Sequence, residues 1–306
     1  MPPSVVASAP GSVMLFGEHS VLRGGPAIVA AIERRLSVRI TPRSDQTIDL
    51  RSSLGNVSTT CSDLSFGHAL RFVEGALCLI RPNHGLSIEI VSSIDPTVGL
   101  ASSASVTVAL LAALQALTTT SIGRQKLLID ACSVIRSVQG HGSGADAASI
   151  VYGGVIAYRM DKAAVTSLCE DLPLVLVYSG TKTPTPEVIR YVHRAEEGSP
   201  AIYKKLFDAI DIVSVEAIDA IRSQDLQKAG ALMNQANGLM EALGVGTPEL
   251  SRICWALRSE PTIFGAKISG SGLGDAAVGL GALPPSFFGS CLPSAVARRG
   301  VEVTWS

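Results

Sequence analysis

The chain is predicted to be an α+β protein, because strand signals dominate its first third and helix signals dominate its second half. Short apolar or β-branched runs bounded by Pro, Gly and Ser recur up to residue 90. Beyond that point, long helical patterns are interspersed with isolated strands. A length of 306 residues suits one domain or two of about 150 residues. The change of pattern near residue 165 favours two, residues 1–165 and residues 166–306.

The strands are predicted from alternation and from apolar content. Leu86–Ile90 (LSIEI) alternates strictly between apolar and polar residues, which is typical of a strand with one buried face. Leu172–Ser179 (LPLVLVYS) is almost continuously apolar and is expected to be a buried strand. The other predicted strands are Val5–Ala9, Val13–Phe16, Leu36–Thr41, Thr47–Leu50, Val155–Arg159, Ala266–Ser269, Ala276–Gly281 and Val301–Trp305.

Helical patterns begin after Gly99. Ser103–Leu117 is rich in Ala and Leu and nearly all apolar, so it is expected to be a buried helix. A second helix, Ile122–Gln139, is predicted to end at the glycine-rich loop GHGSGAD. In the second half, amphipathic periodicity predicts helices at Pro186–Glu196, Ser199–Ser223, Leu226–Leu243 and Thr247–Arg258.

Composition excludes several classes of protein. Hydrophobic residues make up 47% of the chain and mean hydropathy is +0.35, yet no apolar run reaches the ~18 residues of a membrane span. The 25 basic and 26 acidic residues form no stripe suited to nucleic acid. The six cysteines lack metal-ligand spacing and no signal peptide is visible, so a cytoplasmic location is expected. The apolar excess is assigned to a packed core or to the interface of a homodimer.

Two glycine-rich segments suggest ligand contacts, and each also has a purely structural interpretation. Glu18 and His19 end the segment that starts at Ala9, and they can offer an acceptor and a switchable donor to a hydroxylated ligand. They also fit a solvated surface turn. The segment Asp95–Ser105 opens the predicted buried helix, whose N-terminal N–H groups suit a phosphate. It lacks the GK[ST] of a Walker A loop, and a capping turn also explains it.

Two aspartates follow the remaining glycine-rich segments. Asp146 comes after GSGA, where a lone carboxylate is usually a cap or a solvated turn residue. If it faces a substrate hydroxyl, it can act as a base or as an orienting acceptor. Phe264–Asp275 packs its glycines densely into one turn, which implies positive φ angles or a closely approaching partner. Asp275 at its end is interpreted as a solvated turn residue, with a metal ligand as the alternative.

Together and in this order, the segments resemble the motifs of the GHMP kinase superfamily. Those motifs are an APGK-like segment, PxGLGSSA, SGxD and a GAKxxGxGxGG loop, and the match runs over essentially the whole chain. The resemblance implies a two-domain α+β GHMP kinase fold, with one domain like part of a ribosomal protein and a ferredoxin-like C-terminal domain. Within the superfamily the chain is similar to mevalonate kinases at Phe16–Val21, Val138–Gly140, Tyr178–Thr183 and Leu232–Val245.

That resemblance implies ATP- and Mg²⁺-dependent phosphorylation of mevalonate, in the route to isoprenoids. Asp146 would be the catalytic base, and Glu18, His19 and Thr181 would hold mevalonate. Ser103 would also touch Mg²⁺. The residues implied to contact the ATP phosphates are Gly99, Leu100, Ala101, Ser102, Ser103, Gly270 and Gly272.

Two departures from the family pattern bear on catalysis. Ser12 stands where the family commonly has a lysine that lowers the pKa of the aspartate. Ile135 stands where many members have a glutamate for Mg²⁺. Phosphoryl transfer depends chiefly on positioning and charge stabilisation, so an active kinase of a divergent subgroup is expected. Lys182 and Arg136 are the candidate replacement cations.

Three alternatives remain. A phosphomevalonate kinase needs extra Arg or Lys in the acceptor pocket, whereas Glu18 and His19 suit a neutral alcohol better. A non-catalytic, ligand-sensing degenerate kinase fits Ser12 and Ile135, but the retained Asp146 argues against it. A decarboxylase of the same superfamily is disfavoured by the mevalonate kinase-like segment Leu232–Val245.

Overall fold

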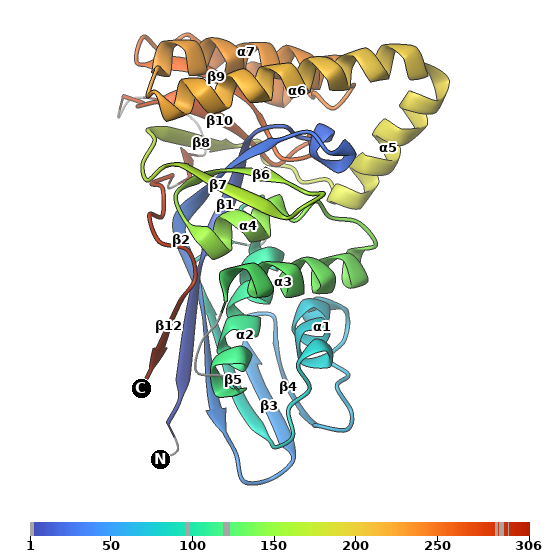
Figure 1. Cartoon of the computed structure of the whole chain (residues 1–306), viewed down its shortest axis with the longest axis vertical. Coiled ribbons are helices and arrows are strands. Elements are labelled where there is room, and N and C mark those ends of the chain that lie inside the picture. The colour runs from blue at the N-terminus through green and yellow to red at the C-terminus, as the bar shows by residue number, and fades with distance from the viewer. Residues whose placement is uncertain (1–2, 96–97, 119–122, 285–286, 288–290, 293) are drawn as a thin grey trace.

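The computed structural model describes residues 3–95, 98–118, 123–284, 287, 291–292 and 294–306. Two sheets with their helices are stacked along the long axis of the molecule (Figure 1). In the first sheet the strand order is β12-β1-β2-β5-β3-β4, and β6 pairs with both β2 and β7. Its strands are β1 (Val5–Phe16), β2 (Ala27–Pro42), β3 (Thr47–Ser52), β4 (Gly55–Thr60), β5 (Leu86–Ser92), β6 (Val155–Arg159), β7 (Ala164–Cys169) and β12 (Glu302–Trp305).

β1 is continuous, although the sequence predicts two strands there. Its register against β2 shifts between Pro10, which pairs with Arg35, and Gly11, which pairs with Ile32. The extra residues of this bulge therefore lie in β2, and β1 itself is not broken. Gly11 allows a close approach, since a Cβ at this position would lie 3.1 Å from the carbonyl oxygen of Leu100. The next residue, Ser12, lies against the loop before α2, and its N–H donates to the Leu100 carbonyl at 3.3 Å.

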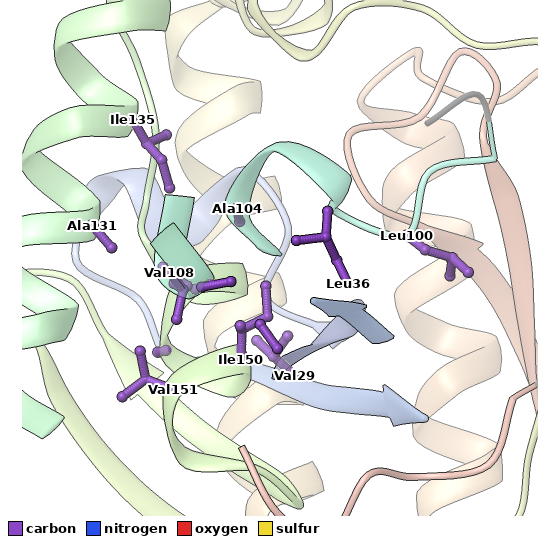
Figure 2. Close-up of a cluster of buried hydrophobic side chains, with 14 of the residues drawn as sticks. Val29, Leu36, Leu100, Ala104, Val108, Ala131, Ile135, Ile150 and Val151 are labelled. Atoms are coloured by element: carbon purple, nitrogen blue, oxygen red, sulfur yellow. The ribbon is translucent and has the colours of Figure 1, made fainter. Parts of the chain in front are cut away.

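Helices cover one face of the first sheet (Figure 1). The buried helix expected from the Ala/Leu-rich run is confirmed: Val108 and Leu111 of α2 are fully buried. Burying such a side chain contributes roughly 1.5–3 kcal/mol, so packing holds α2 firmly on the sheet. Figure 2 shows Val108 close to Ile150 of α4 and Val29 of β2. These helices are α1 (Arg71–Leu79), α2 (Ser102–Thr118), α3 (Arg124–Gln139) and α4 (Ala145–Tyr152).

The second sheet has the order β11-β8-β10-β9, and helices lie against it. The glycine-rich segment Phe264–Asp275 comprises most of β9 and the turn that joins β9 to β10. Helix α7 packs directly on the β9 backbone, since a Cβ at Gly265 would lie 2.0 Å from the Gly230 carbonyl oxygen. The elements are β8 (Leu174–Tyr178), β9 (Ile263–Ser269), β10 (Ala276–Gly281), β11 (Cys291–Leu292), α5 (Thr185–Gly198), α6 (Pro200–Arg222), α7 (Leu226–Ala242) and α8 (Pro248–Arg258).

Several described elements are absent from the sequence-based prediction, among them α1, β4, β7 and β11. α1 contains Gly75, which weakens its helical pattern but lets it approach α3, because a Cβ there would lie 2.9 Å from Val134 Cγ1. β7 runs across residue 165, and β12 near the C-terminal end pairs with β1. The division into two domains near residue 165 stays a prediction. No helix within the described ranges is long and apolar enough to cross a membrane.

Candidate active site

A cleft of about 910 Å³ is lined by residues from both parts of the molecule, and every glycine-rich loop singled out in the sequence contributes to it. Ser12 and His19 reach it from β1 and the turn that follows. Ser103 comes from the first turn of α2, Asp146 from the first turn of α4, and Gly270 from the turn between β9 and β10. Groups far apart in the sequence therefore face one space.

Three of the residues implied by the motifs do not line this cleft. Leu100 is buried in the core. Gly272 packs against Val245, where a Cβ would meet the valine Cβ at 2.6 Å. Thr181 is exposed outside the lining, and its carbonyl accepts the backbone N–H of Asp275 at 2.8 Å. The implied residues that do line the cleft are Glu18, His19, Gly99, Ala101, Ser102, Ser103, Asp146 and Gly270.

Asp146 is held by a chain of two serine hydroxyls. Ser12 Oγ donates to Asp146 Oδ1 at 2.8 Å, and Ser149 Oγ donates to Ser12 Oγ at 2.8 Å. Ser149 lies three residues along α4 from Asp146, on the same side of the helix. The position that holds a lysine in many family members is thus filled here by a neutral donor. A hydroxyl donor favours the carboxylate less strongly than a lysine charge would.

The electrostatic surroundings of Asp146 favour a proton acceptor. Burial raises the pKa of Asp146, and the nearby Glu18 charge raises it further. The Ser12 hydrogen bond and the Lys182 ammonium lower that pKa in part. A carboxyl group with a raised pKa binds a proton more readily than an ordinary aspartate, which suits a general base.

The two candidate replacement cations occupy different positions. Lys182 lines the cleft, and its charge lowers the pKa of both Asp146 and Asp275. Arg136 instead donates to the Gly142 carbonyl at 3.1 Å, so it holds the loop that precedes Asp146. Lys182 is therefore the cation that acts on the aspartate.

Glu18 and His19 are buried rather than solvated, so the surface-turn interpretation is wrong. Glu18 is 3% exposed and forms an ion pair with Lys267, which is fully buried. His19 Nε2 lies 2.8 Å from the Ser271 carbonyl, which can only accept, so Nε2 carries the proton. Burial lowers the pKa of His19. The neutral ring therefore keeps Nδ1 as an acceptor for a ligand.

Asp275 is also buried, at 8% exposed, so its interpretation as a solvated turn residue is wrong. Burial raises the pKa of Asp275, as does the Asp146 charge, while Lys182 lowers it. Sequence reasoning missed the roles of Lys267 and Ser149. The role of Lys267 could have been inferred from its position as the single lysine in the apolar strand IFGAKIS, because a buried ammonium needs a counter-charge.

Family models and a relative identify the superfamily. The model of the GHMP kinases N terminal domain matches residues 68–154, and that of the GHMP kinases C terminal matches residues 217–285. A galactokinase galactose-binding signature matches residues 1–42. The mevalonate kinase of Pyrococcus furiosus is 33% identical over 292 residues, which cover 88% of this chain and 87% of that protein. The chain belongs to the GHMP kinases. The resemblance seen in the sequence motifs is thereby confirmed.

Solved structures share the fold of this GHMP kinase. The Lin0012 protein from Listeria innocua has a TM-score of 0.88 at 20% identity, covering 98% of this chain and 99% of that chain. The L. major mevalonate kinase in complex with R-mevalonate has a TM-score of 0.73 at 28% identity, covering 90% and 86%. The two-domain α+β GHMP kinase fold expected from the motifs is confirmed.

Proposed function

We propose that this GHMP kinase transfers the γ-phosphoryl group of ATP to the primary hydroxyl of mevalonate. The observation that carries the proposal is one cleft in which the loop at the start of α2 faces the half-buried Asp146. Curated relatives named mevalonate kinase, at 30–34% identity over most of the chain, support the choice of acceptor.

ATP would bind with its phosphates at the loop of residues 99–103. Small side chains there leave backbone N–H groups accessible, and α2 is long enough to present a positive N-terminal dipole. The adenine ring of ATP would lie among apolar side chains, because a purine ring is more stable there than in water. The apolar lining residues available for it include Leu36, Phe72, Ile90, Ile94, Val106 and Val138.

The residues present fit Mg²⁺ bound jointly with ATP rather than in a cage of protein ligands. Within the described ranges there is no group of three or more His, Cys, Asp or Glu side chains placed to hold a metal. Magnesium in kinases is typically held by one or two side-chain oxygens plus substrate phosphates, and Ser103 lines the cleft where it can supply one. When bound, the ion would neutralise charge on the phosphates.

Asp146 would accept the proton of the mevalonate hydroxyl as that oxygen attacks the γ-phosphorus. A bond forms between the hydroxyl oxygen and phosphorus, the bond to the β–γ bridging oxygen breaks, and ADP leaves. Glu18 and His19 would orient the acceptor, since the neutral His19 ring offers Nδ1 to a hydroxyl. Thr181 lies outside the cleft lining but next to Lys182, which lines it, so a contact between Thr181 and mevalonate stays a prediction. The homodimer and the cytoplasmic location stay predictions.

An acceptor panel tests this function. We expect ADP release with mevalonate and none above background with phosphomevalonate, homoserine or galactose; galactose is included because of the matching signature at residues 1–42. Turnover of phosphomevalonate or galactose instead would assign the chain to another GHMP kinase. Thermal stabilisation by Mg-ATP without turnover of any alcohol would select the degenerate, ligand-sensing kinase.

Replacing Ser12 with Ala is expected to shift the acid limb of the kcat/KM profile to higher pH. The base must be a carboxylate, so activity falls as pH drops through the pKa of Asp146. The Ser12 hydrogen bond lowers that pKa, and its removal raises it. Profiles of the wild type and Ser12→Ala should be measured beside Ser137→Ala, an exposed serine on α3 whose loss should move nothing. An unmoved limb in Ser12→Ala contradicts the prediction.

Lys182→Met is expected to shift the same limb upward, because the Lys182 charge also lowers the pKa of Asp146. Arg136→Met serves as the contrast. It should lower kcat by loosening the loop at Gly142, without moving the limb. If Arg136→Met moves the limb and Lys182→Met does not, the assignment of the two cations is reversed.

A further inference from the structure

Among the carboxylates of the cleft, one has a buried oxygen with no partner. In the described lining these carboxylates are Glu18, Asp146 and Asp275. Glu18 pairs with Lys267, and Asp146 accepts the Ser12 hydroxyl. Asp275 Oδ1 is buried and receives no hydrogen bond from any described residue. A carboxylate oxygen removed from water and left unpaired costs free energy, so it points to a partner that binds there.

The Asp275 carboxylate lies between the two loops that would surround the ATP phosphates. A Cβ at Gly99 would lie 2.9 Å from Asp275 Oδ1, and a Cβ at Gly270 would lie 3.7 Å from Asp275 Oδ2. Both glycines line the cleft, one before α2 and one after β9. A negative carboxylate this close to a triphosphate repels it, unless a cation lies between the two.

The backbone holds Asp275 firmly in this position. Its N–H donates to the Thr181 carbonyl at 2.8 Å, and its carbonyl accepts the Ser179 N–H at 2.8 Å. Its φ is 65°, in the left-handed region that residues other than glycine occupy at a cost. These bonds tie the turn after β9 to the end of β8, so the carboxylate is presented to the cleft in a fixed place.

We propose that Asp275 is a ligand of the Mg²⁺ that accompanies ATP, acting with the Ser103 hydroxyl and phosphate oxygens. A metal ion would provide the partner that Oδ1 lacks and would separate the carboxylate from the phosphates. Carboxylate oxygens are hard ligands that Mg²⁺ prefers in phosphate-binding sites. The proposal rests on the kinase function proposed above and adds a named residue to it.

Metal affinity can be measured apart from turnover, with Mn²⁺ as the probe. Free Mn²⁺ is followed by electron paramagnetic resonance during titration of the protein with a non-hydrolysable ATP analogue. We expect Asp275→Asn to weaken Mn²⁺ binding in the ternary complex by at least about tenfold. Asp275→Gly should do the same, and glycine accepts the left-handed φ without strain, so it covers a folding failure of the first variant. The exposed Asp171→Asn is the matched control.

In EDTA, where no metal is bound, the substitution is expected to change the affinity for the ATP analogue in the opposite direction. Without metal, Asp275→Asn should bind the analogue as tightly as the wild type or more tightly, because a repulsive charge is gone. Unchanged Mn²⁺ binding overturns the proposal, as does an equal loss of analogue binding with and without metal. A wild type that binds the Mn²⁺–analogue complex but phosphorylates no mevalonate contradicts the proposed acceptor alone and leaves the role of Asp275 standing.

Discussion

Asp146→Asn is expected to lower kcat for mevalonate phosphorylation by roughly 10²–10⁴-fold, the usual contribution of a positioned general base. Asparagine has nearly the same shape and can still accept the Ser12 hydroxyl, so the chain of serine hydroxyls should persist. What is lost is the ability to take the proton of the attacking hydroxyl. The raised pKa of Asp146, caused by burial, makes the wild-type carboxylate a better acceptor than an ordinary aspartate.

Single-turnover ADP formation measures this effect, and equilibrium binding of the ATP analogue is the companion readout. Analogue affinity should change little, because Asp146 lies on α4 whereas the phosphate loop leads into α2. Asp171→Asn, at an exposed position, should leave both quantities unchanged. A rate within a few-fold of the wild type would show that Asp146 orients the acceptor and does not remove its proton.

The sequence predicted the fold largely because local patterns agreed with the tertiary context. The apolar run of α2 and the alternating residues of β5 each have a single plausible structure, and both were predicted within two residues of their bounds. β1 was predicted as two strands because Pro10 and Gly11 are ordinary breakers. Both residues nevertheless pair with β2, which carries the extra residues of the bulge, and Leu100 lies against Gly11. No local sequence pattern encodes these contacts.

In the candidate site, ion pairing and burial of charged residues also could not be predicted from local sequence patterns. Motif order pointed to Asp146 and the 99–103 loop, and the structure places Asp146 and most of that loop in the lining of one cleft. Motif order did not reveal that Glu18 pairs with a lysine 249 residues later, or that Asp275 is buried rather than solvated. Burial and counter-charge depend on which strands the topology brings together, and here a turn after β1 meets the interior of β9.

The Glu18–Lys267 pair gives the largest stability prediction. Lys267→Met is expected to lower the free energy of unfolding by about 3–5 kcal/mol, because it leaves the Glu18 carboxylate buried without a counter-charge. Urea unfolding followed by circular dichroism measures the loss. The exposed pair of Lys204 and Asp208 on α6 is the matched control, and Lys204→Met should cost about 0.3–0.5 kcal/mol.

A double variant separates the charge effect from the loss of packing. Adding Glu18→Gln to Lys267→Met removes the uncompensated charge, so the double variant should be more stable than Lys267→Met alone. Mevalonate affinity should not recover with it, because Glu18 would itself contact the acceptor. Recovery of neither property would mean that the pair acts through packing between β9 and the segment after β1. If only stability recovers, the Glu18 carboxylate has two roles: the fold must neutralise its charge with Lys267, and the carboxylate contributes to mevalonate binding.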